Sequence, residues 1–203
     1  KPLRILVFSE PVTGIYVPGR RECVSCKQAE DLMQEVADLS DNLSLEIYNI
    51  KEDQEMAKDW GIEHTPTISL VADEDVGIRF IGLPNGYEFG SFFETILSFS
   101  KKDFGLSEEV AAKVAGVTEQ IEIKTFSTPT CPHCPRAIVN AHRMALANPL
   151  ITSTAVESQE FSELAGQYDV YSVPKIVVNE THHFVGGLPE PEFVEAVLEG
   201  AGR

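Results

Sequence analysis

The sequence predicts an α/β protein made of two tandem units, each with a central mixed β-sheet flanked by helices. Three observations support this prediction. The chain has 203 residues, which is enough for two units of about 100 residues each. Runs with strand character alternate with helical patterns in the order βαβαββα, in which crossover helices imply parallel pairing and a hairpin implies antiparallel pairing. The same order then occurs a second time.

The first unit begins with a short apolar run at residues 3–8, which is followed by a loop rich in turn-forming residues. A helical pattern starts at Cys26, and Asn42 can end it. The remaining predicted elements are an alternating strand at 43–50, a short helix at 53–60, a strand at 67–71, its hairpin partner at 78–81 and an amphipathic helix at 88–98.

An internal duplication relates the two halves of the chain. Adding 108 to a residue number in the first half gives the matching residue in the second half, as 23 becomes 131. The matched pairs include Cys23 and Cys131, Cys26 and Cys134, Trp60 and Tyr168, Ile62 and Val170, Pro66 and Pro174, and Ile68 and Ile176. A constant offset across cysteines, apolar positions and a proline indicates a repeat. With a linking helix predicted at 107–115, we place the N-terminal unit at residues 1–116 and the C-terminal unit at residues 117–203.

All four cysteines fall in two Cys-X-X-Cys pairs, Cys23/Cys26 and Cys131/Cys134. Each pair stands where a strand leads into a helix, and the unpaired N–H groups and positive dipole end of a helix start favour an anion. Such surroundings lower a cysteine pKa from about 8.5 to between about 3.5 and 7.5. We therefore expect Cys131, in the first turn, to be the nucleophile and Cys134 to be the buried resolving thiol, with Cys23 and Cys26 in the same roles.

Neighbouring cations favour a thiolate. His133 lies between the two thiols of the second pair, where a protonated imidazole would stabilise the Cys131 thiolate. Arg20, Arg21 and Lys27 surround the first pair, although ordinary surface charge explains them equally well. The first pair reads Cys-Val-Ser-Cys, without a proline or histidine inside it. A purely structural role for this pair is therefore an alternative interpretation.

Two cysteine pairs could also form a single zinc site. Structural zinc ribbons separate their pairs by roughly 15 to 20 residues, whereas residues 27–130 intervene here and each pair has its own complete unit. We therefore expect no metal. Among aromatic and histidine residues, Trp60 and Tyr168 are expected in core packing, His182 and His183 at the surface, and His64 either near the first dithiol or in solvent.

Composition limits the possible partners and location. The net charge of −16 repels phosphate backbones, so nucleic-acid binding is not expected. The sequence has no run of 18 apolar residues and no signal-peptide pattern before the first strand, so we expect no membrane insertion. Paired cysteines without a scattered disulfide framework indicate redox chemistry in a cytoplasmic protein.

The tandem arrangement resembles a known family. The second half reads TFSTPTCPHCP and then QYDVYSVPKIVVN, and the whole chain is similar to the glutaredoxin-like protein disulfide oxidoreductases, which are two thioredoxin folds in tandem. The resemblance implies cis Thr65-Pro66 and cis Val173-Pro174 peptide bonds beside the dithiols, where the preceding backbone pairs with an extended substrate segment. The sequence lacks the Trp-Cys-Gly-Pro-Cys motif of thioredoxin, and no Asp lies in the strand at 121–127 to accept a proton.

The resemblance implies a thiol–disulfide oxidoreductase that reduces, forms or isomerises protein disulfides through both redox disulfides, Cys23–Cys26 and Cys131–Cys134. No cofactor is expected, because the cysteines carry the electrons. The expected partners are protein disulfide or dithiol substrates and a thioredoxin-reductase-like flavoprotein as electron donor. The alternative is an electron-relay module that serves a dedicated flavoprotein reductase or peroxidase, similar to the tandem domain of the alkyl hydroperoxide reductase flavoprotein, whose first unit lacks the dithiol. A scaffold with inert disulfides is a third possibility.

Overall fold

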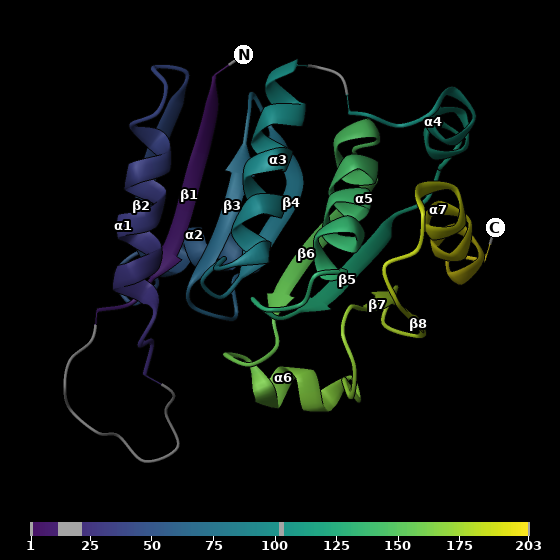
Figure 1. Cartoon of the computed structure of the whole chain (residues 1–203). Coiled ribbons are helices and arrows are strands. Elements are labelled where there is room, and N and C mark those ends of the chain that lie inside the picture. Colours follow the sequence, from purple (N-terminus) through teal and green to yellow (C-terminus); the bar gives the residue numbers. More distant parts are fainter. Residues whose placement is uncertain (1, 12–21, 102–103, 203) are drawn as a thin grey trace. The chain divides into compact units, whose positions relative to one another are not determined.

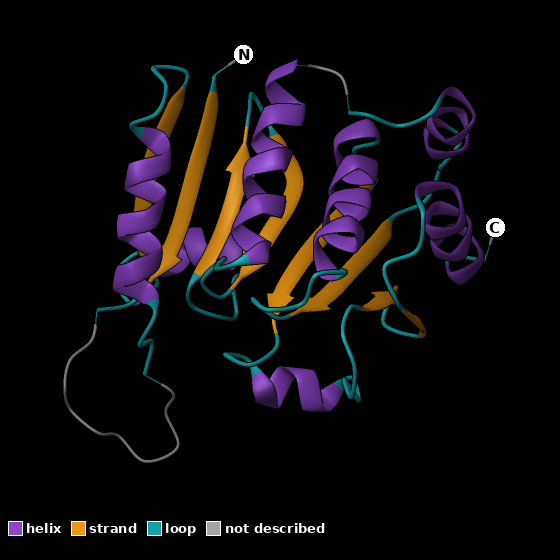
Figure 2. Cartoon of the chain, viewed as in Figure 1, coloured by secondary structure: helices purple, strands orange, loops and turns teal. Residues whose placement is uncertain are grey.

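The computed structural model describes residues 2–11, 22–101 and 104–202. The chain divides into two compact units, Lys1–Asp75 with Arg79–Leu83, and Val76–Ile78 with Pro84–Arg203. Each unit combines strands with flanking helices, as Figures 1 and 2 show. The predicted α/β class, with a mixed sheet and helices in each unit, is therefore confirmed.

The strands of the first unit follow the order β2-β1-β3-β4. Strand β1 pairs in parallel with β2 and antiparallel with β3. Helix α1 packs on β1 and β2, and α2 contacts β2 (Figure 1). The bounds are β1 Leu3–Ser9, α1 Cys26–Ala37, β2 Leu43–Asn49, α2 Gln54–Asp59, β3 Thr67–Val71 and β4 Asp75–Ile81. The elements agree with the predicted ones, except that α1 ends before Asn42 and β4 starts earlier than expected.

Aromatic and aliphatic side chains form a hydrophobic cluster in the first unit. Leu6, Phe8 and Val71 form a buried cluster, against which partly buried apolar side chains pack, among them Trp60. The ring centroids of Phe8 and Trp60 are 6.1 Å apart. The expected core role of Trp60 is confirmed.

The strands of the second unit follow the order β6-β5-β7-β8. Strand β5 pairs in parallel with β6 and antiparallel with β7, and β7 pairs antiparallel with β8. Helix α5 packs on β5 and β6 and is contacted by α3, α4 and α7. The bounds are α3 Tyr87–Lys101, α4 Glu108–Ala115, β5 Ile121–Ser127, α5 Cys134–Ala147, β6 Ile151–Glu157, α6 Ser162–Gln167, β7 Lys175–Val178, β8 His182–Val185 and α7 Glu190–Gly200.

Two features separate the structure from a simple repeat. Helix α3 follows the first hairpin in sequence, yet it contacts α5 and belongs to the second compact unit; the boundary after residue 116, which rests on the repeat, stays a prediction. The ends of the first strands, Ser9 and Ser127, also do not follow the repeat offset of 108. Cys23 stands 14 positions after the strand end Ser9, whereas Cys131 stands 4 positions after Ser127, so the sequence between strand and dithiol is 10 residues longer in the first unit.

The remaining aromatic and histidine expectations concern the second unit. The ring of Tyr168 packs 5.2 Å from that of Phe126, and the side chains of His182 and His183 are exposed. Both expectations are confirmed. Within residues 2–11, 22–101 and 104–202, no helix is both long and apolar enough to cross a membrane.

Candidate functional site: two dithiols at helix starts

The second dithiol lies between β5 and α5. Cys131 and Cys134 form a disulfide with their Cα atoms 5.5 Å apart. Cys134 is the first residue of α5, so Cys131 lies ahead of the helix and not in its first turn as expected. The helix start still acts on Cys131, because the backbone N–H of Cys134 donates to the Cys131 Sγ atom at 3.1 Å. An N–H without an intrahelical partner thus points at this sulfur, where it would stabilise a thiolate.

The two cysteines of this pair differ in exposure. Cys131 keeps 8% of its surface exposed, whereas Cys134 is fully buried. Cys131 is therefore the more accessible residue of the pair. This ordering agrees with a nucleophilic Cys131 and a resolving Cys134.

The segment before Pro174 lies against Cys131. The Val173–Pro174 peptide bond is cis, as is Thr65–Pro66 in the first unit, so both implied cis bonds are confirmed. The carbonyl oxygen of Val173 is 3.8 Å from Cys131 Sγ. The Gly186 N–H donates to the Pro174 carbonyl at 2.9 Å and ties this segment to the turn after β8.

Close backbone contacts hold the loop that carries the second dithiol. The Tyr87 N–H at the start of α3 donates to the carbonyl of Pro129 at 2.9 Å. On the other flank, a Cβ atom at Gly187 would stand 2.5 Å from the His133 carbonyl oxygen. Only glycine permits that approach. His133 itself is the N-cap residue of α5, and its side chain is exposed beside the dithiol.

A buried carboxyl group lies at the base of this site. Glu88 of α3 has no exposed surface, and its Oε1 atom accepts a hydrogen bond from Ser127 Oγ at 2.6 Å. Its Oε2 atom has no hydrogen-bond partner in the described part of the chain. Burial raises the pKa of Glu88 to about 8, the Ser127 hydroxyl opposes the rise, and the nearby Glu157 adds to it. Ser127 ends the strand that leads into the dithiol loop, so a carboxyl that is protonated at neutral pH lies next to this loop.

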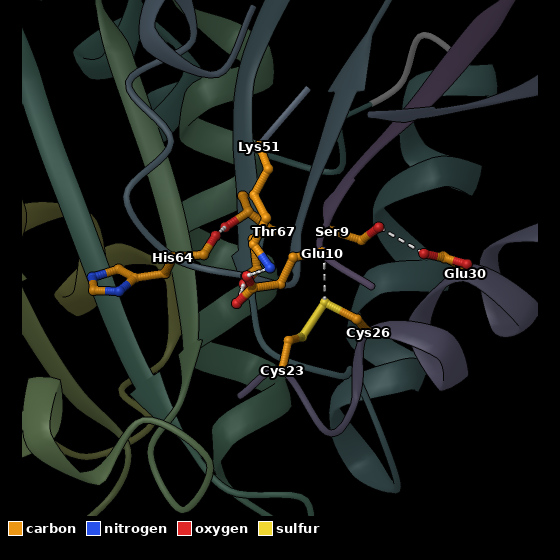
Figure 3. The surroundings of a disulfide bond; sticks show 9 residues. Ser9, Glu10, Cys23, Cys26, Glu30, Lys51, His64 and Thr67 are labelled. Atoms are coloured by element: carbon orange, nitrogen blue, oxygen red, sulfur yellow. Dashed lines mark hydrogen bonds and ion pairs between the residues drawn. A yellow bond between two sulfur atoms is a disulfide. The ribbon is translucent and has the colours of Figure 1, made fainter. Parts of the chain in front are cut away.

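The first dithiol has a different set of contacts, which Figure 3 shows. Cys23 and Cys26 form a disulfide with their Cα atoms 5.4 Å apart, and Cys26 is the first residue of α1. Both residues are buried, with 2% and 1% of their surfaces exposed. The backbone N–H of Glu10, directly after β1, donates to Cys26 Sγ at 3.3 Å. The hydrogen bond therefore reaches the second sulfur of this pair, whereas in the second site it reaches the first.

The side chain of Glu10 joins this dithiol to the Thr65-Pro66 segment. It is buried, with 8% of its surface exposed, and its Oε2 atom pairs with Lys51 Nζ at 2.9 Å. Its Oε1 atom accepts a hydrogen bond of 3.4 Å from the hydroxyl of Thr65, the residue before Pro66. A buried carboxylate with a lysine partner thus lies beside the first dithiol.

The other residues expected near the first dithiol contribute less. Lys27 donates to Asp31 at 2.6 Å on the exposed face of α1, and this partner raises the pKa of Lys27. Figure 3 shows the His64 ring directed away from the disulfide. Arg20 and Arg21 lie outside the described residues.

Sequence reasoning found the four cysteines and the two proline segments and missed the carboxyl groups. Glu10 carried a signal, because an acidic residue follows directly on the apolar strand at residues 3–8. Glu88 carried none, since it comes from a helix that the repeat assigns to the other unit. In the described ranges no group of three or more His, Cys, Asp or Glu residues could hold a metal ion.

Two α/β units, each with a Cys-X-X-Cys pair at a helix start beside an X-Pro segment, define a tandem thioredoxin-fold protein with two dithiol sites. Residues 120–199 match the family model of a thioredoxin domain. The structure is similar to that of a protein disulfide oxidoreductase from Aeropyrum pernix, with a TM-score of 0.86 and 28% identity over 100% of this chain and 87% of that one. The predicted resemblance is therefore confirmed.

A second group of relatives consists of alkyl hydroperoxide reductases. The alkyl hydroperoxide reductase AhpF of Pseudomonas aeruginosa is 28% identical over 171 residues, which cover 84% of this chain and 31% of that protein. The chain thus spans less than a third of the length of such relatives. The structure of AhpF from Enterococcus faecalis has a TM-score of 0.85 at 23% identity over 97% of this chain and 90% of that one, which shows the shared fold.

Proposed function

We propose that this chain is a thiol–disulfide oxidoreductase that exchanges disulfides with protein substrates through both of its dithiols. One observation carries the proposal: Cys131 Sγ receives the first N–H of a helix and lies 3.8 Å from the carbonyl oxygen of Val173, on a segment that can pair with an extended chain. The similar protein disulfide oxidoreductase from Aeropyrum pernix supports it.

The reaction needs only the cysteines. The Cys131 thiolate attacks one sulfur of a substrate disulfide, the substrate S–S bond breaks, and the released substrate thiolate takes up a proton. Cys134 then loses its proton and attacks Cys131 Sγ, which breaks the mixed disulfide and releases the second substrate sulfur as a thiol. Two electrons pass from the dithiol to the substrate. The reverse sequence oxidises a substrate dithiol. In isomerisation a second substrate thiol attacks the mixed disulfide and releases Cys131, with no net transfer of electrons, and none of these reactions requires a cofactor.

A buried carboxyl group can act as the proton acceptor for the resolving thiol of the first site. The backbone N–H of Glu10 donates to Cys26 Sγ and its side chain pairs with Lys51, so its carboxylate lies beside that thiol. Glu88 has a pKa of about 8 and therefore holds a proton at neutral pH, so it does not take this role at the second site.

Electron relay is the second candidate function. The AhpF relatives favour it, because this chain matches them over most of its own length but less than a third of theirs. In this role a thioredoxin-reductase-like flavoprotein would reduce the dithiols, which would pass electrons to a peroxidase. We propose a cytoplasmic location in either case, since paired redox cysteines fit a reducing compartment.

Insulin reduction with dithiothreitol tests the general oxidoreductase. Catalysis without any partner protein is expected for the general enzyme, whereas turnover only with one flavoprotein is expected for the relay. A Cys134→Ser variant should also accumulate a mixed disulfide through Cys131, which mass spectrometry locates. An adduct on another residue contradicts the assigned nucleophile, and absence of any exchange with glutathione indicates inert disulfides.

A further inference from the structure

A buried lysine lies directly after the Val173-Pro174 segment of the second unit. Lys175 is the first residue of β7, follows Pro174, and keeps only 5% of its surface exposed. Lysine is almost never buried this deeply unless its ammonium group is paired. The partners of Lys175 Nζ are two backbone carbonyls, those of Tyr168 at 2.5 Å and Asp169 at 3.0 Å.

These two carbonyls are at the start of the loop that carries Val173. Tyr168 is the C-cap residue of α6, and Asp169 has a positive φ of 52°. Carbonyls at a helix end lack intrahelical partners, and a cation there satisfies them and the negative dipole end. Lys175 follows the loop at residues 168–174 and bonds to the carbonyls of its first two residues, so it holds the two ends of the loop together.

The first unit carries out the same task with different chemistry. Its equivalent residue is Thr67, which follows Pro66 and donates from its hydroxyl to the His64 carbonyl at 2.7 Å. Each of the two residues pairs with a phenylalanine on the first strand of its unit, Thr67 with Phe8 and Lys175 with Phe126. At one repeat position a neutral hydroxyl thus bonds to a carbonyl three residues earlier in the chain. At the other position a charged ammonium bonds to carbonyls six and seven residues earlier.

Resting on the proposed function, we propose that Lys175 is a positioning residue for the second site, which holds the 168–174 loop so that its Val173 backbone can pair with an extended protein substrate. Lys175 bonds to loop carbonyls and not to sulfur, so we expect its loss to act on the loop and to leave the potential of Cys131/Cys134 unchanged. Loss of Lys175 should therefore weaken substrates that dock along the loop and spare small disulfides that react only at Cys131.

The test uses the full chain with Cys23 and Cys26 replaced by serine, so that only the second site reacts. Lys175→Met keeps the apolar stem and removes the hydrogen-bond donors. We expect the KM for insulin to rise about tenfold, which corresponds to the binding energy lost with one charge-assisted hydrogen bond. The rate with hydroxyethyl disulfide and the glutathione equilibrium of Cys131/Cys134 should stay unchanged. Lys175→Arg, which keeps the charge and donors, should restore most of the affinity.

A matched control is Lys124→Met. Lys124 is also partly buried in the second unit and lies 5.6 Å from the centre of the Tyr168 ring, but it pairs with the carboxylates of Glu122 and Glu180. The Lys124→Met variant should leave the KM for insulin unchanged. An equal KM rise in both lysine variants, or a shifted potential in Lys175→Met, overturns the positioning role. If Lys175→Met does not fold, Lys175→Gln replaces it, and a KM equal to that of the parent then overturns the inference.

Failure of the proposed function gives a different result. In that case the parent itself does not reduce insulin, and amide hydrogen exchange of residues 168–174 becomes the readout. Faster exchange in Lys175→Met than in Lys124→Met supports the positioning role, and equal exchange in the two overturns it.

Discussion

The two dithiols share a motif but differ in which sulfur the backbone supports. In the second unit the N–H of Cys134 donates to the first sulfur, Cys131, whereas in the first unit the N–H of Glu10 donates to the second sulfur, Cys26. A hydrogen bond to a sulfur stabilises its thiolate and hence the reduced state. The same Cys-X-X-Cys spacing therefore has different redox consequences in the two units.

The carboxyl groups around the dithiols differ as well. The serine that ends the first strand of each unit donates to a glutamate at 2.6 Å, Ser9 to Glu30 and Ser127 to Glu88. Glu30 belongs to the partly exposed face of the helix that starts at the dithiol, while Glu88 comes from α3 and is fully buried. A repeat can thus keep a hydrogen bond and change its electrostatic environment.

The largest expected effect separates the two nucleophiles. Cys131→Ser should remove most disulfide reductase activity, on the order of a hundredfold or more, because it removes the better-supported thiolate. Cys23→Ser should remove only part. Insulin reduction by both variants checks this ranking, and a greater loss in the Cys23 variant reverses our assignment of the main site.

Glu88 should make the stability of the folded protein depend on pH. The pKa of Glu88 is raised from 4.5 to about 8 in the folded protein, so the folded state holds a proton that the unfolded chain releases. Its contribution to stability is therefore full below about pH 4.5 and is lost as the pH rises through about 8. Relative to wild type, Glu88→Gln should gain on the order of a few kcal/mol between about pH 5 and about pH 9.

Denaturant unfolding over this pH range measures the effect, with Glu30→Gln as the matched control. The control removes the carboxylate that the equivalent serine contacts, but at a partly exposed position. A constant difference between Glu88→Gln and wild type at all pH values would show that Glu88 is already ionised in the folded protein.

His133 is expected to have the smallest effect, because its side chain is exposed and solvent screens its charge. A protonated imidazole stabilises the Cys131 thiolate and so favours the reduced dithiol. His133→Val should raise the Cys131 pKa and make the potential more negative by less than about 30 mV, since about 30 mV corresponds to about 1.4 kcal/mol. Iodoacetamide alkylation across pH, with glutathione equilibration, checks both quantities. An unchanged pKa and potential would make His133 a spectator.

The sequence predicted local features and missed long-range ones. The disulfide pairs, the strand–helix order and the proline segments follow from short motifs and their repeat, and the structure has them all, although Cys131 lies ahead of α5 and not in its first turn. The contacts of Glu88 and Lys175 depend on how α3 and the 168–174 loop pack, which no periodicity encodes. The repeat groups α3 with the first unit, whereas its contacts are with α5, because equivalent positions in a duplication need not keep equivalent neighbours.

The reduction potential of each dithiol tests the central difference between the two sites most directly. The double variant Cys131→Ser/Cys134→Ser isolates the first dithiol, and Cys23→Ser/Cys26→Ser isolates the second, so that each can be equilibrated with glutathione. We predict a more negative potential for the first site, because the Glu10 carboxylate there disfavours a thiolate, than for the second, where the helix start supports Cys131. Equal potentials, or a more negative value at the second site, would contradict this account.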